Sequence, residues 1–323
     1  MKAVVCRRFG PPEVLQTKMI DKPIPKDNEV LVKIHAATVT KFDCWIRSSS
    51  RMFRFLMRLA TGIRFPKDTL LGTELAGEIE AVGKDVVLFN IGDQVFAFLG
   101  MRMGAYAEYI CLQEESVMAT KPINMTFDEA AAVQQGALSA LYFLRMTNIQ
   151  RGQKILIYGA SGGVGLFTVQ LAKYFGAEVT GVCSTTKIDL VKSMGADKIV
   201  DYKKEDFTKS GEIYDIIFDT IGTSPFSGSV RSLKDGGIYL FVTYGILRSI
   251  RARVHNLTSS KKTVSKIIEE TTDDLLFIKN LIEEGKLRVA IDRRFPLDQA
   301  AQAHRYVETG RKKGNVIITI VDS

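Results

Sequence analysis

The chain has 323 residues, of which 46% are hydrophobic and 25% are charged, and its formal net charge is +8. This length exceeds that of one ordinary domain and predicts two, with the composition of a globular protein. A basic charge is compatible with nucleic acid or an anionic membrane surface as a partner. A basic enzyme with anionic ligands is the simpler interpretation, so no nucleic-acid partner is expected.

The sequence also predicts a cellular location. No apolar run approaches the roughly 18–20 residues that span a bilayer, and the first residues show no signal-peptide pattern. The four cysteines form no CxxC pair, so we expect neither a disulfide framework nor a structural zinc lobe. Together these features predict a cytoplasmic protein without a transmembrane segment.

The pattern of apolar and turn residues changes near Phe127. Before it, short alternating segments such as residues 29–39 are separated by turn residues, which predicts a β-rich barrel or sandwich. After it, apolar strands alternate with helical segments, which indicates a parallel doubly wound sheet. The last segment holds one helix and one strand, and we expect that strand to return to the β-rich domain. The predicted domains are residues 1–124, completed by residues 267–323, and a cofactor-binding domain at residues 125–266.

A glycine-rich turn follows the predicted strand at residues 154–158 and opens a helix, the context in which such a turn binds a dinucleotide. Gly162 permits close approach of the backbone to a pyrophosphate, and Gly165 permits close packing of helix on strand. Ala160 stands at the first glycine position of the usual pattern. The predicted cofactor-binding residues of this turn are Ala160, Ser161, Gly162, Gly163, Val164 and Gly165.

The end of the next predicted strand favours NADP(H) over NAD(H). A site for NAD places an acid there to bind the ribose 2′-hydroxyl, but this chain has hydroxyls and a lysine, which attract a 2′-phosphate. Tyr202, after the third strand, adds a phenolic donor. The predicted contacts with the 2′-phosphate are Ser184, Thr185, Lys187 and Tyr202.

Several motifs in this order resemble the medium-chain dehydrogenase/reductase superfamily, and most of all its zinc-free quinone oxidoreductase branch. The motifs are GTELAGEIEAVGKDVVLFNIGDQVF, AAAVQQGALSALYFL, YGASGGVG, GADKIVDY and FPLDQAAQAHRYVETGRKKGNV. The resemblance implies an α/β fold with a GroES-like β-rich catalytic domain and a Rossmann cofactor domain. It also implies a homodimer that pairs through an edge strand of the cofactor domain.

The same resemblance argues against a metal. Zinc-dependent relatives hold catalytic zinc through side chains at the positions of Thr40, Thr73 and Gln135, and hydroxyls and an amide make a poor zinc site. Without a Lewis acid, alcohol oxidation becomes hard, whereas quinones and α,β-unsaturated carbonyls need little activation. The implied reaction is hydride transfer from NADPH to such an acceptor.

The resemblance also assigns individual residues. Thr40 and Trp45 are expected to line the substrate pocket, and Lys41 is a candidate proton donor or oxyanion stabiliser. Apart from the resemblance, Asp43 and Arg47 are expected to form a structural pair that supports this loop. The further residues expected to contact the cofactor are Ser139, Thr243 and Asn315.

Two basic segments, residues 47–67 and 248–266, leave alternatives open. The first is ranked as a lid over the substrate site, ahead of a membrane-surface helix or a nucleic-acid patch. One rival function is an NADPH-binding regulatory or nucleic-acid-binding protein with little turnover. Another is an alcohol or aldehyde reductase.

Overall fold

The structure is a computed structural model that describes residues 1–8, 10–48, 69–242, 259–264, 266 and 268–320. Thr243 and most of the two basic segments lie outside these residues. The chain forms two compact units, one of residues 1–135, 271–283 and 288–323, the other of residues 136–270 and 284–287. The division between Gln135 and Gly136 falls inside helix α4 (Gln134–Met146), whereas the sequence suggested a boundary after residue 124.

The first unit is rich in antiparallel strands. Its described strands are β1 (Lys2–Cys6), β2 (Leu15–Met19), β3 (Glu29–Thr38), β4 (Thr69–Leu70), β5 (Glu74–Val82), β6 (Gln94–Phe98), β7 (Tyr109–Gln113), β8 (Met118–Thr120), β15 (Ile291–Pro296) and β16 (Asn315–Thr319). They form a small sheet in the order β2-β1-β4 and a large one in the order β15-β16-β3-β5-β6-β8, with β7 also paired to β3. β16 lies antiparallel to β3, which confirms that the last strand returns to this unit.

Helices of the first unit cover these sheets. They are α1 (Lys41–Ser48), α3 (Phe127–Ala131), α9 (Thr272–Glu283) and α10 (Ala300–Glu308), with short 3₁₀ turns η1 (Pro12–Val14), η2 (Gly100–Arg102) and η5 (Leu297–Gln299). α10 buries Ala300, Ala303, His304 and Val307, the i, i+3, i+4, i+7 spacing of one helical face. This face joins the core of the unit, and α10 packs against α1.

The second unit contains a parallel sheet in the order β11-β10-β9-β12-β13-β14. Its described elements are β9 (Lys154–Tyr158), α5 (Gly163–Tyr174), β10 (Glu178–Cys183), η3 (Thr185–Lys187), α6 (Ile188–Ser193), β11 (Lys198–Asp201), η4 (Phe207–Lys209), β12 (Tyr214–Asp219), α7 (Phe226–Arg231), β13 (Leu233–Phe241) and β14 (Lys262–Val264). β9 and β12 are buried along most of their length, as expected of central parallel strands. The predicted doubly wound fold is confirmed.

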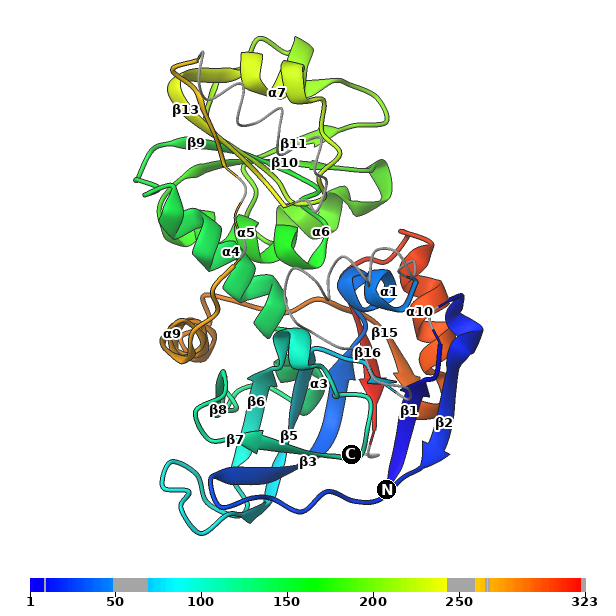
Figure 1. Cartoon of the computed structure of the whole chain (residues 1–323). Coiled ribbons are helices and arrows are strands. Elements are labelled where there is room, and N and C mark those ends of the chain that lie inside the picture. The colour runs from blue at the N-terminus through cyan, green and yellow to red at the C-terminus, as the bar shows by residue number, and fades with distance from the viewer. Residues whose placement is uncertain (9, 49–68, 243–258, 265, 267, 321–323) are drawn as a thin grey trace. The chain divides into compact units, whose positions relative to one another are not determined.

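The strand order reverses direction at β9. From β9 the chain steps outward through α5 to β10 and through α6 to β11, and it then returns to β12 on the other side of β9. Right-handed crossovers therefore place α5 and α6 on one face of the sheet and α7 on the other (Figure 1). In such sheets, ligands bind outside the carboxyl ends of the strands at this reversal.

No helix among the described residues is both long and apolar enough to cross a bilayer.

Candidate functional site

The glycine-rich turn lies at the carboxyl end of β9, where the strand order reverses. Gly159 has a φ of +84°, which glycine tolerates best, and it turns the chain out of the strand. The N–H groups of Gly159 and Ala160 donate to the Val182 carbonyl of β10, each at 3.1 Å. Gly162 donates to the Gly159 carbonyl at 3.0 Å and precedes the first residue of α5. The turn is thus anchored to β10 before the helix begins.

Two glycines of this turn have different surroundings. A Cβ atom at Gly165 would lie 2.3 Å from the Gly159 carbonyl oxygen, so close packing inside the protein requires glycine there. A Cβ at Gly162 would meet nothing closer than the same oxygen at 3.4 Å, an ordinary contact. Internal packing therefore does not require glycine at 162, but close approach of a ligand to the backbone does.

The start of α5 has the chemistry that a pyrophosphate requires. The helix runs for 12 residues, and the N–H groups of its first turn have no partner within the helix. Together with the helix dipole, these groups attract an anion at the N-terminus. The residues at 159–165 therefore fit a dinucleotide, and Ser161, Gly163 and Val164 would hold its phosphates.

The carboxyl ends of β10 and β11 form the neighbouring part of the site. Cys183 and Asp201 are in register, and the Tyr202 N–H donates to the Cys183 carbonyl at 3.1 Å. Tyr202 is 50% exposed, and the Lys203 ammonium lies over its ring, 5.3 Å from the ring centroid. The sequence analysis missed Asp201, an acid that ends an apolar strand one position before Tyr202. The Thr185 hydroxyl donates to its carboxylate at 2.5 Å, and this bond lowers the pKa of Asp201.

This bond restricts what Thr185 can do. A hydroxyl carries one hydrogen, and that of Thr185 is bound to Asp201, so Thr185 has no hydrogen left to donate to a phosphate. Ser184 and Lys187 flank it and remain candidate donors. The Lys187 N–H donates to the Ser184 carbonyl at 2.9 Å, which holds these two residues in one tight turn. Ser139 is buried on α4.

In the first unit, Thr40 and Asp43 cap the start of α1. Asp43 accepts from the N–H and the hydroxyl of Thr40, at 2.8 and 2.6 Å, and its own N–H donates back to that hydroxyl at 3.2 Å. This is the reciprocal pattern of a capping box. The Thr40 hydroxyl hydrogen is consequently engaged, so toward a ligand Thr40 acts as an acceptor.

Two buried carboxyl groups lie in the same region. Burial raises the pKa of Asp43 to about 6, although the bonds from Thr40 oppose this rise. Burial also raises the pKa of Glu74 to about 7. Glu74 accepts from the Thr38 hydroxyl and from the Gln135 N–H, the latter at 2.7 Å. Both acids are therefore partly protonated near neutral pH.

Arg47 does not pair with Asp43, so that expectation was wrong. Arg47 is fully buried and donates instead to Glu308, to the Gly10 carbonyl, and to Nδ1 of His304 at 3.3 Å. The reason is packing, because α10 lies against α1 and presents Glu308 and His304 to the arginine. Asp43, in turn, is engaged in the helix cap.

His304 continues this hydrogen-bonded chain. Burial and the Arg47 charge lower the pKa of His304 to about 3, so its ring is neutral. Because Nδ1 accepts from Arg47, Nε2 carries the hydrogen and donates to the Tyr106 hydroxyl at 3.2 Å. Tyr106 then donates to the Thr38 carbonyl at 3.1 Å. This chain joins residues that are far apart in the sequence, and it was not predicted from the sequence.

The remaining predicted residues have the following positions. Lys41 is exposed at the first position of α1. Trp45 is partly buried and packs beside Phe42, with ring centroids 5.9 Å apart. Asn315 begins β16, and its side-chain amide donates to the Ala290 carbonyl at 3.4 Å.

The positions that correspond to zinc ligands in zinc-dependent relatives have a different donor set. The Thr40 hydroxyl is bound to Asp43, and the Thr73 hydroxyl is buried with no hydrogen-bond partner among the described residues. Gln135 contributes a neutral amide. Within the described part of the chain, no three or more His, Cys, Asp or Glu side chains are grouped as a metal site requires. These three side chains do not fit zinc, which binds thiolate, imidazole or carboxylate.

Comparisons with known proteins agree with this architecture. Residues 26–122 match the family model described as alcohol dehydrogenase GroES-like domain, and residues 194–318 match the one described as zinc-binding dehydrogenase. The chain is 32% identical over 315 residues to the chloroplast envelope quinone oxidoreductase homolog of Arabidopsis thaliana, covering 94% of this chain and 93% of that one. It is 31% identical to the chloroplastic NADPH-dependent alkenal/one oxidoreductase of the same plant, covering 98% and 79%.

Solved structures show the same relationship. The quinone oxidoreductase of Coxiella burnetii superposes with a TM-score of 0.89 at 29% identity, over 99% of each chain. The Escherichia coli quinone oxidoreductase in complex with NADPH gives a TM-score of 0.85 at 25% identity, over 99% of this chain and 100% of that one. The chain therefore belongs to the medium-chain dehydrogenase/reductase superfamily, in its quinone oxidoreductase-like branch, and is an oxidoreductase whose second unit binds an NAD(P)-type cofactor.

Proposed function

We propose that this enzyme reduces quinones or α,β-unsaturated carbonyls with NADPH and does so without zinc. The observation that carries the proposal is the donor set of Thr40, Thr73 and Gln135, which offers two hydroxyls and an amide where zinc-dependent relatives hold the metal. A reaction in this site must proceed without a Lewis acid on the substrate oxygen. Acceptors with an activated π system meet that condition. The printed names of the relatives, which include quinone and alkenal/one oxidoreductases, support the same class.

NADPH is the proposed cofactor because of the residues after β10. The basic side chain of Lys187 and the donors Ser184 and Tyr202 suit a 2′-phosphate. Asp201 is in register with Cys183 at the end of β10, and its carboxylate accepts a hydrogen bond from the Thr185 hydroxyl. When bound, a reduced nicotinamide supplies a hydride. The protein holds the dinucleotide through the turn at 159–165 and the residues after β10.

The first unit supplies the proposed substrate pocket. Thr40 acts there as a hydrogen-bond acceptor, and Trp45 offers a flat apolar surface on which a quinone ring can stack. Lys41 is exposed and is the proposed proton donor or oxyanion stabiliser. Thr243, Ser139 and Asn315 are proposed as further cofactor contacts. Catalysis would depend mainly on orientation and exclusion of water.

We further propose a homodimer and a cytoplasmic location. The parallel sheet of the second unit ends at β11 on one side and β14 on the other, and an edge strand of this kind can pair with a second copy. Two relatives carry chloroplast names and another a mitochondrial one, so fractionation of the source cells is the test of location.

The test of acceptor and cofactor is a steady-state assay. The purified protein is given NADPH or NADH and a panel of quinones, enones, aldehydes and alcohols, and the nicotinamide absorbance is followed. We expect turnover with quinones or enones and higher kcat/KM with NADPH than with NADH. Turnover confined to aldehydes or alcohols would contradict the proposed acceptor class. Cofactor binding without turnover of any acceptor would favour a regulatory protein.

A further inference from the structure

The loop after β12 lies directly against the glycine-rich turn. β9 and β12 are parallel neighbours, and Asp219 at the end of β12 is in register with Tyr158 at the end of β9. The Thr220 N–H donates to the Tyr158 carbonyl at 3.0 Å, and the Thr220 hydroxyl lies within hydrogen-bond distance of the carbonyls of Tyr158 and Gly159, at 3.0 and 3.3 Å. A Cβ atom at Gly159 would lie 2.8 Å from the Thr220 hydroxyl oxygen. The Ile221 side chain is also close, 2.9 Å from the same Cβ position, so Thr220 and Ile221 form a wall beside the turn at the start of the 220–223 loop.

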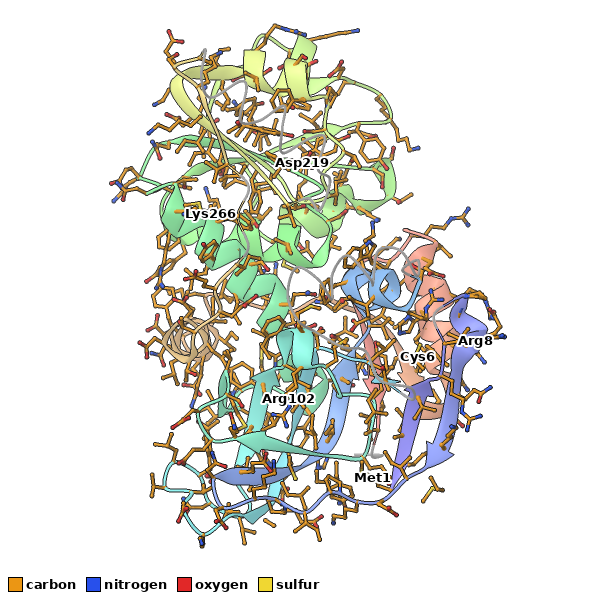
Figure 2. The ribbon with its side chains drawn as sticks, viewed as in Figure 1. Met1, Cys6, Arg8, Arg102, Asp219 and Lys266 are labelled. Atoms are coloured by element: carbon orange, nitrogen blue, oxygen red, sulfur yellow. The ribbon has the colours of Figure 1, made fainter. Side chains whose placement is uncertain are left out.

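The carboxylate of Asp219 determines the shape of this wall. Asp219, labelled in Figure 2, is fully buried. One of its oxygens accepts from the N–H groups of Ile221 and Gly222, at 3.2 and 2.8 Å. The other accepts from the Ser224 N–H at 2.8 Å and from the Tyr239 hydroxyl at 3.1 Å. Four donors thus converge on one carboxylate, and three of them are backbone groups of the loop.

The tyrosine that donates to this carboxylate is itself held by a hydrogen bond. Tyr239 is fully buried on β13, and because its hydroxyl hydrogen goes to Asp219, the Ser224 hydroxyl donates to Tyr239, with the oxygens 2.7 Å apart. The carboxylate, the tyrosine and the serine therefore belong to one hydrogen-bond network between β12, β13 and the loop, which the Ser229 hydroxyl of α7 joins at 3.2 Å from the Ser224 hydroxyl. Hydrogen bonds to a buried charged group are among the stronger ones in proteins.

The order of the strands indicates which part of the cofactor this wall adjoins. A dinucleotide crosses the carboxyl edge with its pyrophosphate at the turn after β9 and its adenosine ribose at the end of β10. Since β10 and β12 flank β9 on opposite sides, the other half of the dinucleotide extends toward β12. We propose that Asp219 is a positioning residue that shapes the 220–223 loop for the nicotinamide half of the cofactor. This inference rests on the proposed use of NADPH.

The test is the variant Asp219→Asn. The amide of asparagine would turn a donor toward either the Ile221 and Gly222 amides or the Ser224 amide and Tyr239, so the loop must rearrange. Two ligands are titrated calorimetrically: NADPH, and 2′,5′-ADP, which lacks the nicotinamide half. Asp215→Asn is the matched control, because Asp215 lies at the other end of β12, where it accepts from the Lys154 N–H at 2.7 Å.

We expect Asp219→Asn to weaken NADPH binding about tenfold or more while 2′,5′-ADP binding stays within about twofold. Asp215→Asn should change neither. Tyr239→Phe removes one of the four donors and should weaken NADPH binding less, again without affecting 2′,5′-ADP. This variant replaces Asp219→Asn in the test if Asp219→Asn does not fold. Equal losses for both ligands, or no loss for either, would overturn the proposal. Because these are binding measurements, they stand even if no acceptor is reduced, the result that would instead defeat the proposed function.

Discussion

Lys187 and Thr185 share the short 3₁₀ turn after β10, yet their side chains have different roles. The Thr185 hydroxyl is engaged by Asp201, so Lys187 provides the charge in this turn that a 2′-phosphate requires. We expect Lys187→Ala to raise KM for NADPH about tenfold or more and to leave KM for NADH nearly unchanged. Kinetics with both cofactors measure this, with the exposed Lys192→Ala on α6 as control. Equal effects on both cofactors would show that Lys187 does not contact the 2′-phosphate.

The buried His304 should make the free energy of unfolding depend on pH. Its pKa is lowered from 6.5 to about 3 in the folded protein, so the unfolded chain binds a proton more readily. This group therefore contributes stability above about pH 6.5 that is lost as the pH falls toward 3. Between pH 7 and pH 5 the loss from His304 alone is about 2 kcal/mol.

The matching variant is His304→Gln, whose amide can still donate to Tyr106. Asp43 and Glu74 have raised pKa values and oppose this trend, because their contribution is lost as the pH rises from about 4 toward 7. They are present in both proteins, so the difference between wild type and variant isolates the histidine. Urea unfolding at several pH values should show a shallower loss of stability at low pH for the variant. Parallel curves would contradict the burial of a neutral His304.

In the turn before α5, one glycine is needed for internal packing and another is proposed to be needed for ligand binding. Gly165→Ala places a Cβ atom 2.3 Å from a backbone oxygen and should lower the free energy of unfolding by about 1–3 kcal/mol. Gly162→Ala makes only a 3.4 Å contact at a φ of −81°, so the fold should be preserved within about 1 kcal/mol. Its cofactor affinity should nevertheless fall on the order of tenfold.

Urea denaturation and cofactor titration of the two variants test this separation. Normal cofactor binding by Gly162→Ala would mean that the backbone at 162 does not approach the ligand. A fully stable Gly165→Ala would mean that the helix can move away from the strand without cost.

The sequence predicted those features that depend on local order. Strand, glycine turn and helix follow one another within residues 154–174, so their pattern indicated the Rossmann unit and its phosphate-binding turn directly. Contacts between residues that are distant in the chain were not predicted correctly. Arg47 and His304 are separated by 257 positions, and the pairing of Arg47 depends on how α10 packs on α1. The sequence led us to expect Asp43 as the partner of Arg47, but Asp43 caps the start of α1.

Acids at strand ends were the signal that was overlooked. Asp201 and Asp219 each end an apolar parallel strand, where side chains gather at the ligand-binding edge. The sequence alone could not show that Asp201 engages Thr185 or that Asp219 organises its own loop, because both depend on side-chain and turn geometry.

The whole molecule combines the cofactor fold of its superfamily with hydroxyl and amide side chains at the positions where zinc-dependent relatives bind the metal. The two units share α4, which begins in the first and continues into the second. The nucleotide-binding turn belongs to the second unit, whereas Thr40, Thr73 and Gln135 belong to the first. The residues proposed to choose between NADPH and NADH and the residues at the zinc-ligand positions therefore belong to different units, so substitutions of Ser184 or Lys187 should change cofactor preference without changing metal content.

The most direct test of the central claim measures zinc and turnover on the same sample. Protein purified without chelator is analysed for bound metal by mass spectrometry, and NADPH oxidation with a quinone is then recorded before and after exhaustive chelation. We expect far less than one zinc per chain and the same kcat/KM in both assays. Stoichiometric zinc, with activity lost on chelation and restored by added zinc, would contradict it.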